Sequence, residues 1–338
     1  MKRQQHLDTL LCYLCAQPEF EVTFVSLHGE SDVKPYLESR IQGLLVIPLH
    51  GKPDIKGRLS IGLKLRKTLL ERKPDIVYVI DSWTLPYFWI ATLGRLRFKQ
   101  SKLVYHTYDM LSIGQHSRFY HNLERRMASR ADLNVNADIN RAWITRYWFD
   151  LPETPLVLPV LFSKHNSLYH LTKNEKRHAV RYSLGIKDHH LLVIAPTCCG
   201  ENRMSFELIQ AFALLPDEWR LVTIKAEGDY FNRCSNWVQD RDLLHRIHFM
   251  EPMDQNDIIA LTAAADVGII FHQISSSLGN YFSHPSRLAY YLSLGLPTLA
   301  TEASNMEAII YKYRLGACCD CTSPAAIAEA LEKMLLDG

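Results

Sequence analysis

The chain has 338 residues, 47% of them hydrophobic and 22% charged, and a formal net charge of +2. These values exclude disordered, collagen-like and coiled-coil chains, and the length suits two domains of roughly 150–170 residues. Residues 1–160 carry 22 Lys and Arg against 16 Asp and Glu, and the remainder carry 16 against 20. This small excess of positive charge in the first half, with no nucleic-acid motif, argues against a nucleic-acid partner. Peripheral contact of the first half with an anionic membrane stays open.

Membrane and metal signals are weak. The most apolar stretch, Trp83–Gly94, has 12 residues, whereas a membrane span needs about 20. The first residues are predicted to form an amphipathic helix rather than a signal peptide, because Asp8 interrupts their apolar run. Eight cysteines include the run CCDC at 318–321, but no second pair lies at zinc-site spacing. We therefore expect reduced thiols, no metal, and a cytoplasmic location.

Short β-branched runs alternate with longer amphipathic stretches, which is typical of α/β units on parallel sheets. Strands are predicted in the first half at 22–27, 44–47, 76–80, 103–106 and 133–135, with helices around 59–72, 85–95, 116–129 and 139–149. Strands are predicted in the second half at 191–195, 221–225, 247–250, 267–271 and 297–300, with helices at 204–216, 285–294 and 324–336. The sequence thus predicts two Rossmann-like, doubly wound domains, residues 1–165 and 166–338.

The first domain lacks its opening strand. A doubly wound nucleotide-type domain begins with a strand and a glycine-rich turn, whereas this chain begins in a helix. Two arrangements are compatible with that pattern. Either residues 22–27 pair directly with residues 76–80 and close the gap, or the natural start lies upstream of Met1. We favour the second, because the chain also stops directly after a helix.

The segment from Asn280 to Thr301, NYFSHPSRLAYYLSLGLPTLAT, carries the clearest chemistry. Pro285 suits a first helical turn and Gly295 suits a C-terminal left-handed position, so a short helix is predicted between them. A helix N-terminus presents free N–H groups and a partial positive charge, and Arg287 adds a fork of donors for phosphate oxygens. From spacing alone, an anion site and a capped surface helix are equally compatible with this segment.

At this point the sequence resembles the retaining, nucleotide-sugar-dependent glycosyltransferases of the GT-B fold. The resemblance covers nearly the whole chain as an ordered series of segments. They are KPDIVYVID, KLVYHTYDM and LERRMASRADLNVN in the first half, and RYSLGI, LLVIAP, MSFELIQAFALLP, residues 245–272 and the PSRLAYYLSLGLPTLAT block in the second. It implies transfer of a sugar from a nucleotide-diphosphate donor, held by the second domain, to an acceptor held by the first. Neither a metal nor a cofactor is implied.

The resemblance also implies a set of donor-binding residues. Arg203 and Arg287 match the basic residues that contact the donor diphosphate. Asn280 and Ser286 lie in the loop and helix start near the phosphates, and Glu251 lies in the stretch that grips the nucleobase. The chain departs from the family at the ribose, where the usual glutamate is replaced by Tyr290.

In the first domain the family often has Asp-x-His-Glu, whereas this chain has His106, Thr107, Tyr108 and Asp109. Tyr108 therefore replaces the histidine near the transferred sugar, and His106 and Asp109 keep polar groups close by. We assign His106, Tyr108 and Asp109 as the candidate catalytic residues. The replaced positions leave a second interpretation open, a catalytically inactive pseudo-glycosyltransferase that acts as a binding or scaffold subunit. An epimerase on the same architecture would need acidic and histidine residues that the sequence does not place.

Overall fold

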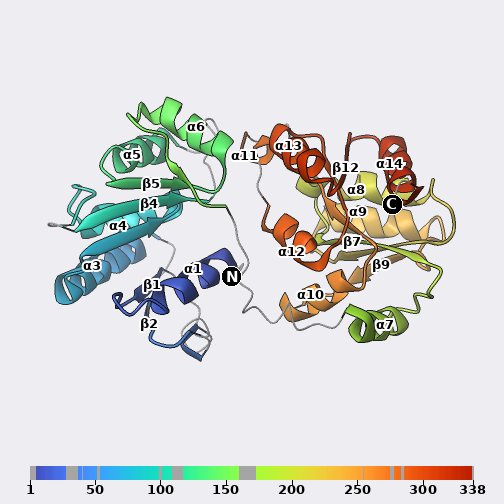
Figure 1. The fold of residues 1–338 in the computed structure, drawn as a ribbon, viewed down its shortest axis with the longest axis horizontal. Coiled ribbons are helices and arrows are strands. Elements are labelled where there is room, and N and C mark those ends of the chain that lie inside the picture. Colours follow the sequence, from blue (N-terminus) through green and yellow to red (C-terminus); the bar gives the residue numbers. More distant parts are fainter. Residues whose placement is uncertain are drawn as a thin grey trace. The chain divides into compact units, whose positions relative to one another are not determined.

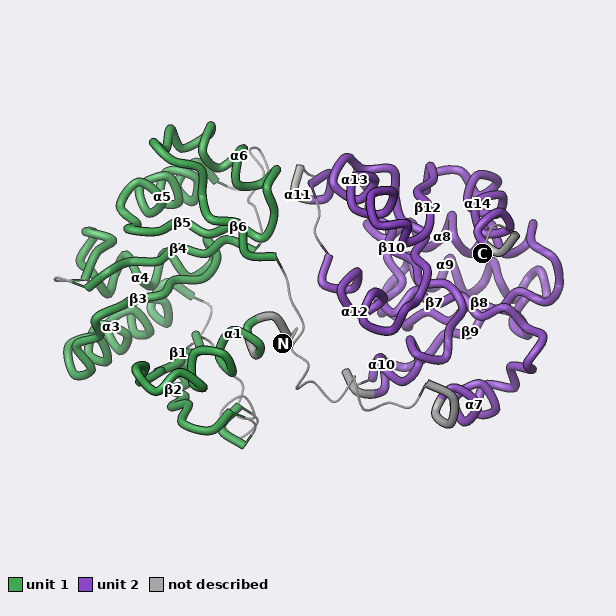
Figure 2. The backbone as a smooth tube through the Cα atoms, viewed as in Figure 1, with its two compact units in different colours: residues 1–161 green, residues 162–338 purple. Residues whose placement is uncertain are grey.

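The computed structural model describes residues 5–27, 37–39, 41–51, 54–98, 101–108, 117–159, 173–253, 255–274, 278–282 and 285–336. The chain forms two compact units, residues 1–161 and 162–338, which are coloured separately in Figure 2. Each unit combines parallel strands with covering helices, which confirms the predicted α/β architecture of two Rossmann-like domains.

The elements of the first unit alternate along the chain (Figure 1). They are α1 (Gln5–Cys15), β1 (Thr23–Leu27), β2 (Leu45–Leu49), α3 (Ile55–Arg72), β3 (Ile76–Ile80), the 3-10 turn η1 (Ser82–Thr84), α4 (Leu85–Ala91), β4 (Lys102–Thr107), α5 (Arg118–Ala128), β5 (Leu133–Asn136), α6 (Ile139–Phe149) and β6 (Leu156–Val157). Strands β3, β4, β5 and β6 form one parallel sheet in chain order, and β1 and β2 form a separate parallel pair.

Helix α3 shows how local sequence sets these boundaries. Asp54 caps its N-terminus by accepting a 2.7 Å hydrogen bond from the Gly57 N–H, and Lys73 ends it in the left-handed region at φ 48°. Ile61, Leu65 and Leu69 recur every four residues and are buried on one face. That face packs into the core of the β3–β6 sheet, together with residues of β3, α4 and β4.

Direct pairing of residues 22–27 with residues 76–80 is wrong. Strand β1 pairs with β2 from Thr23 opposite Leu45 to Leu27 opposite Leu49, and β3 pairs with β4. Side chains alternate across β1 and β2, as in any strand. One face of the β1–β2 pair packs with α1 in a small core that includes Leu11 and Val46. The other face packs against the core of the β3–β6 sheet. The β1–β2 pair is thus covered on both faces without a ladder to β3 among the described strands.

The described residues of the second unit form a six-stranded parallel sheet with its helices. The elements are α7 (Lys173–Ser183), β7 (Leu191–Cys198), the 3-10 turn η3 (Glu201–Arg203), α8 (Ser205–Phe212), β8 (Trp219–Ile224), α9 (Asp229–Gln239), β9 (Ile247–Met250), α10 (Gln255–Ala263), β10 (Val267–Ile270), α11 (Leu278–Tyr281), α12 (Ser286–Leu294), β11 (Thr298–Thr301), α13 (Ser304–Tyr313), β12 (Gly316–Cys319) and α14 (Pro324–Leu336). Several of them, including β12, α9 and α13, are absent from the sequence-based expectation.

The strand order of this sheet is β12-β11-β10-β7-β8-β9. The chain runs from β7 to β8 and β9 on one side and then returns to β10 on the other side of β7. The connection direction therefore reverses between β7 and β10. In open α/β sheets, ligands bind outside the carboxyl ends of the strands at such a switch point.

Two hydrophobic cores cover the two faces of the sheet. One contains residues of α8, α9 and α14, and the other contains residues of α10, α12 and α13. Strand β7 contributes side chains to both cores, since Val193 belongs to the first core and Leu192 and Ile194 belong to the second. On β10, a Cβ at Gly268 would lie 2.5 Å from the Tyr291 ring of α12, so only glycine lets that helix approach so closely.

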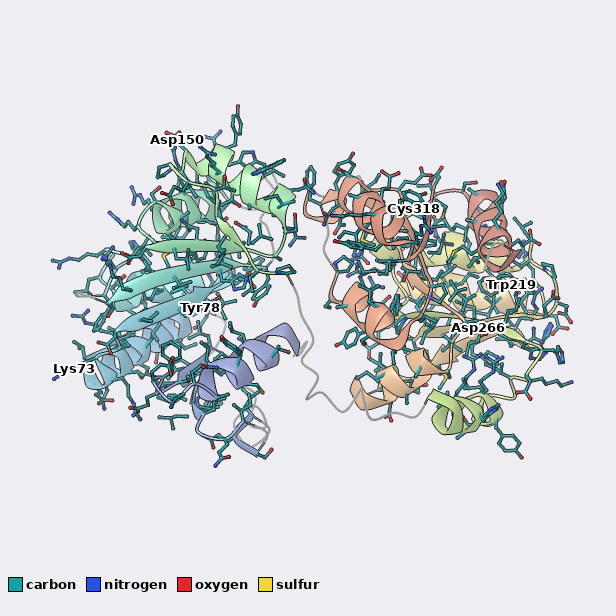
Figure 3. All side chains as sticks on the ribbon, in the orientation of Figure 1. Lys73, Tyr78, Asp150, Trp219, Asp266 and Cys318 are labelled. Atoms are coloured by element: carbon teal, nitrogen blue, oxygen red, sulfur yellow. The ribbon has the colours of Figure 1, made fainter. Side chains whose placement is uncertain are left out.

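An acidic residue at the start of β10 docks α7 onto the sheet. Asp266, labelled in Figure 3, accepts a 2.7 Å hydrogen bond from the Leu192 N–H. Its two oxygens also pair with Arg177 at 2.6 Å and with Arg181 at 3.1 Å. Charge-assisted bonds of this kind to a half-buried carboxylate fix the helix position. The cluster lies at the amino end of β10, away from the ligand-binding edge.

Candidate functional site

Three nitrogen-rich side chains meet at the carboxyl edge of the central strands of the second unit. Arg203 ends η3, which follows β7, and His272 lies two residues beyond β10. Arg287 is the second residue of α12. All three therefore come from segments that start at the switch point between β7 and β10. The predicted pair Arg203 and Arg287 is brought together, and His272 is a member that the sequence analysis did not predict.

The local backbone explains how Arg203 reaches this position. The Gly200 N–H donates to the Ser205 hydroxyl at 3.0 Å, which closes a tight loop between β7 and α8. Met204 then adopts the left-handed region at φ 50° and turns the chain into α8. The following segments are also tied together, since the Gln273 N–H donates to the Asn202 carbonyl at 3.2 Å.

The imidazole of His272 joins the two guanidinium groups. Arg203 Nη1 lies 2.5 Å from His272 Nδ1 and 3.2 Å from Nε2, and Arg287 Nη2 lies 3.4 Å from Nε2. His272 itself is only 6% exposed, and its backbone N–H donates to the Thr301 hydroxyl at 2.9 Å. Two positive charges thus converge on one buried ring, an arrangement that suits an anion.

Arg287 is half-buried and carries no ion pair among those found in the described residues. Its Nη1 donates to the Ile269 carbonyl at 3.4 Å, and the Tyr291 hydroxyl donates to the same carbonyl at 3.1 Å. Burial lowers the pKa of Arg287, although a guanidinium stays charged under any physiological condition. A half-buried charge without a carboxylate partner is costly, and a bound anion would offset that cost.

The remaining predicted donor residues lie around this cluster in different ways. The Asn280 amide donates to the Gln273 carbonyl at 3.1 Å, so it holds the segment after β10. Ser286 is the first residue of α12, and Tyr290 packs partly buried against the core on the α12 face. Glu251 follows β9 and forms an exposed ion pair with Lys225, which follows β8.

The first unit has its own polar cluster at the carboxyl ends of β3 and β4. The Tyr78 hydroxyl, labelled by residue in Figure 3, lies 2.6 Å from His106 Nδ1. The ring centroids of His106 and Tyr108 lie 4.0 Å apart with the ring planes tilted by 34°, and both residues are buried. Burial raises the pKa of Tyr78 to about 12, so its phenol stays protonated. Asp109, the third predicted catalytic residue, lies outside the described residues.

Asp81 is the residue of this cluster that the sequence analysis missed. It directly follows β3, is 7% exposed, and has the backbone angles φ 56° and ψ 155°. Its carboxylate accepts a 2.7 Å hydrogen bond from the Tyr108 N–H, and its own N–H donates to the His106 carbonyl at 2.9 Å. An aspartate at positive φ is strained, and such strain concentrates at functional sites. The signal available in the sequence was an acidic residue at the end of a buried strand.

The described residues also bear on metal binding and on membrane insertion. No group of three or more His, Cys, Asp or Glu side chains there is arranged to hold a metal ion. The three thiols of the CCDC run are buried, and burial raises the pKa of each. Of the helices in the described part of the chain, none is both long and apolar enough to cross a membrane.

Two family models match the chain. The model for glycosyl transferases group 1 matches residues 204–338, and the model for a glycosyl transferase 4-like domain matches residues 8–135. No curated protein sequence is significantly similar to it. The matched segments include His272, Arg287 and most of the first unit, and Arg203 lies one residue before the segment that starts at 204. The chain therefore belongs to the group 1, family 4-like glycosyltransferases of the GT-B fold, the nucleotide-sugar-dependent class.

Solved structures share this fold at low sequence identity. Anabaena HepE, crystallised with UDP-glucose, has a TM-score of 0.75 at 17% identity, over 100% of this chain and 87% of HepE. The sucrose-phosphate synthase of Thermosynechococcus elongatus has a TM-score of 0.72 at 14% identity, over 97% and 83% of the two chains. WaaG, a glycosyltransferase involved in lipopolysaccharide biosynthesis, has a TM-score of 0.65 at 17% identity, over 98% and 86%.

Proposed function

We propose that this chain transfers a hexose from a nucleotide-diphosphate sugar to a saccharide or lipid-linked acceptor, with retention of the anomeric configuration. One observation carries the proposal. Arg203 and Arg287, from two different elements, converge on His272 at the switch point of the second unit. A diphosphate is the ligand whose charge and oxygen atoms match such a set of donors.

The donor is bound by the second domain, residues 166–338, in which each predicted donor-binding residue has a distinct role. Arg203 and Arg287 stabilise the diphosphate as it leaves, and the N-terminus of α12 with Ser286 adds its backbone N–H groups. Asn280 holds the segment after β10 in place through the Gln273 carbonyl. Tyr290 contacts the ribose in place of the family glutamate, and Glu251 contacts the base. The family match at 204–338 and the UDP-glucose bound by HepE support this assignment.

On the acceptor side, residues 1–165, the reacting hydroxyl is positioned by the cluster at the ends of β3 and β4. The resemblance assigns Tyr108 and Asp109 to the family's sugar-proximal positions, and Asp81, which follows β3, accepts a hydrogen bond from the Tyr108 N–H. His106 is completely buried against Tyr78, so we propose that it packs against the Tyr108 ring and holds it in position rather than contacting the acceptor.

A lipid-linked acceptor would be reached from the cytoplasmic face of the membrane by peripheral contact. The first unit carries exposed aromatic side chains, including Trp83 at 51% and Phe119 at 52% exposure. Aromatic rings beside basic residues favour the interface of an anionic bilayer. We therefore propose a cytoplasmic protein with transient membrane contact rather than an integral one.

The proposal is tested by a panel of nucleoside diphosphates and their sugars, with thermal stabilisation of the protein as the readout. A ligand present at 100 times its Kd should stabilise the fold by about 2.7 kcal/mol. The ligand that binds is then incubated with the protein, and release of free sugar is measured without acceptor. Binding with slow hydrolysis is the expected result, and no stabilisation by any member would contradict the proposal.

A second candidate is the catalytically inactive subunit. The observation favouring it is that Tyr108, which by the resemblance stands in place of the family histidine, is only 7% exposed. This interpretation predicts the same donor binding but neither hydrolysis nor transfer, even with a mixed pool of saccharide and lipid-linked acceptors. The hydrolysis assay above therefore separates the two candidates.

A further inference from the structure

Two charged side chains hold the backbone of Tyr108 at both of its polar groups. Tyr108 directly follows β4, which lies between β3 and β5 in the sheet. The Asp81 carboxylate, from the end of β3, accepts a 2.7 Å hydrogen bond from the Tyr108 N–H. The Arg141 guanidinium, from the first turn of α6, donates to the Tyr108 carbonyl. Both peptide groups beside the Tyr108 Cα are therefore held by side chains from neighbouring elements.

Arg141 is held in turn by Asp138, the N-cap residue of α6. One oxygen of Asp138 accepts a 2.9 Å hydrogen bond from the Arg141 N–H, and the other forms an ion pair with Arg141 Nε at 3.1 Å. The Arg141 and Asp138 side chains are only 7% and 5% exposed, so solvent hardly screens the pair. A planar guanidinium that is bound at Nε and at Nη1 keeps little rotational freedom, so it is a rigid donor to the Tyr108 carbonyl.

Asp81 is fixed on the other side of the same residue. Its N–H donates to the His106 carbonyl at 2.9 Å, which extends the pairing of β3 with β4 by one residue. Asp81 is buried and adopts φ 56°. A buried charge and a positive φ each lower stability relative to a neutral side chain in an ordinary conformation. Such an arrangement is typical of a site where the exact placement of another group matters.

The two contacts together set the direction of the Tyr108 side chain. Peptide groups are planar, so fixing both peptide groups beside the Cα fixes the direction of the Cα–Cβ bond. The Tyr108 ring then packs against His106, with the two centroids 4.0 Å apart. Burial raises the pKa of Tyr108, so its phenol stays protonated and offers a hydrogen-bond donor. A donor held in this way is suited to orienting a bound substrate.

We propose that Asp81 and Arg141 are positioning residues of the acceptor site, which act through the Tyr108 backbone to hold the Tyr108 phenol against an oxygen atom of the acceptor. The inference rests on the proposed function, because it takes Tyr108 as a residue that meets the acceptor. Loss of either contact leaves donor binding by the second unit intact but lets the acceptor take unproductive orientations. Water needs no such alignment, so hydrolysis of the donor suffers less than transfer.

The ratio of transfer to hydrolysis tests this inference, because an unfolded fraction of the protein lowers both rates and leaves their ratio unchanged. The protein is incubated with UDP-glucose and octyl glucoside, and octyl diglucoside and free glucose are quantified by mass spectrometry. In Arg141→Gln the ratio should fall roughly 10- to 100-fold, since small misplacements of reacting groups have effects of that size. Arg141→Lys keeps a cationic donor and should recover part of the ratio.

Arg146→Gln is the matched control on the same helix. Arg146 is exposed, and its guanidinium donates to the Thr154 hydroxyl at 3.3 Å and to the Pro152 carbonyl at 3.4 Å. It makes no printed contact with the acceptor cluster among the described residues, so Arg146→Gln should keep the wild-type ratio.

A double-mutant cycle shows whether Arg141 acts through Tyr108. Tyr108→Phe removes the phenol oxygen and should lower the ratio by itself. In the Tyr108→Phe background, Arg141→Gln should have little further effect, because the group to be positioned is already gone. If Arg141→Gln does not fold, the double change Arg141→Gln and Asp138→Asn removes both members of the buried ion pair, and Asp81→Ala removes the other contact with Tyr108. Each should lower the ratio in the same way.

The outcomes separate this inference from the proposed function. Transfer with an unchanged ratio in folded Arg141→Gln or in Tyr108→Phe overturns the positioning role and leaves the transferase intact. Equal effects of Arg141→Gln in both Tyr108 backgrounds also overturn it. If UDP-glucose and octyl glucoside do not react, they are replaced by the sugar nucleotide that the panel identifies and by the mixed acceptor pool. If no acceptor is then glycosylated, the proposed transfer fails and this inference falls with it.

Discussion

By the family resemblance, Tyr290 takes the helix position at which a glutamate holds the donor ribose. Here the phenol lies on α12, three residues after Arg287, and packs partly against the core. A phenol offers a donor and an aromatic face to a ribose, so we propose that nucleotide binding by this chain does not require the carboxylate.

Replacing Tyr290 with glutamate tests this substitution. The variant should bind the best nucleoside diphosphate at least as tightly as the wild type, because a carboxylate accepts hydrogen bonds from both ribose hydroxyls. Affinity is measured by calorimetry, with circular dichroism to monitor folding. Tyr290→Phe keeps the ring and removes the hydroxyl, and it should bind more weakly. A Tyr290→Glu protein that unfolds would show that this side chain is a core residue and that the ribose lies elsewhere.

At the scale of elements, the contact between β4 and α5 contains a buried acid. Glu124 of α5 accepts a 2.9 Å hydrogen bond from the Tyr105 hydroxyl of β4, and it is 3% exposed. Burial is the main cause that raises the pKa of Glu124 to about 7. The folded protein therefore binds a proton that the unfolded chain releases at lower pH.

The sign of this linkage gives a pH dependence of stability. Because the folded pKa lies above the unfolded value, the stabilising proton is fully present below about pH 4.5 and is lost as pH rises through about 7. Glu124→Gln cannot ionise, so its free energy of unfolding should fall less between pH 5 and 8, by up to about 3 kcal/mol. Denaturant unfolding of both proteins across that range measures the difference. Parallel pH curves for the two proteins would show that Glu124 is already ionised in the folded state.

Helix α12 packs closely against strand β10 beside the proposed donor site. Gly268→Ala would place a Cβ 2.5 Å from the Tyr291 ring, so the helix must shift. Overpacking of this kind typically costs about 1–3 kcal/mol of unfolding free energy. In a double-mutant cycle, Tyr291→Ala removes the ring with which the new Cβ clashes. The effects of the two substitutions on the free energy of unfolding should then be far from additive. Additive changes in the free energy of unfolding would mean that the Tyr291 ring of α12 does not pack against Gly268 of β10.

Some elements could be predicted from the sequence with their bounds, and others could not, because their local residue patterns carry no strand or helix signal. Residues 76–80 and 247–250 were predicted at the bounds of β3 and β9, because runs such as IVYVI carry strong strand propensity. Strand β12, Gly316–Cys319, was missed, since GACC has no β-branched residue and gains its place only by pairing with β11. Arg203 was predicted through the family resemblance, and Arg287 through both that resemblance and its place in the first turn of a predicted helix. The contact of Arg203 with His272 spans 69 residues, and no local pattern encodes it.

At the scale of the whole molecule, the proposed membrane contact makes a prediction of its own. The exposed rings on the first unit include Trp89 and Phe119, whose centroids lie 6.4 Å apart. Vesicles containing phosphatidylglycerol should bind the protein more than neutral vesicles do, and salt should weaken that binding. The double change Trp89→Ser and Phe119→Ser should reduce it several-fold. Tyr182→Ser, which removes an 88% exposed ring on the second unit, serves as the control. Equal sedimentation with neutral and anionic vesicles would contradict peripheral contact.

The central claim is that the second unit binds the diphosphate of a sugar nucleotide through Arg203, His272 and Arg287. Calorimetric titration of wild-type protein and Arg287→Ala with the best-binding nucleoside diphosphate tests it most directly. Loss of a charge-assisted hydrogen bond should weaken binding by ~1.5–3 kcal/mol, roughly 10- to 150-fold. Arg241→Ala removes an exposed arginine that lies over the Trp237 ring in the same unit, and it should bind like the wild type. An unchanged affinity in a folded Arg287→Ala protein would contradict the claim.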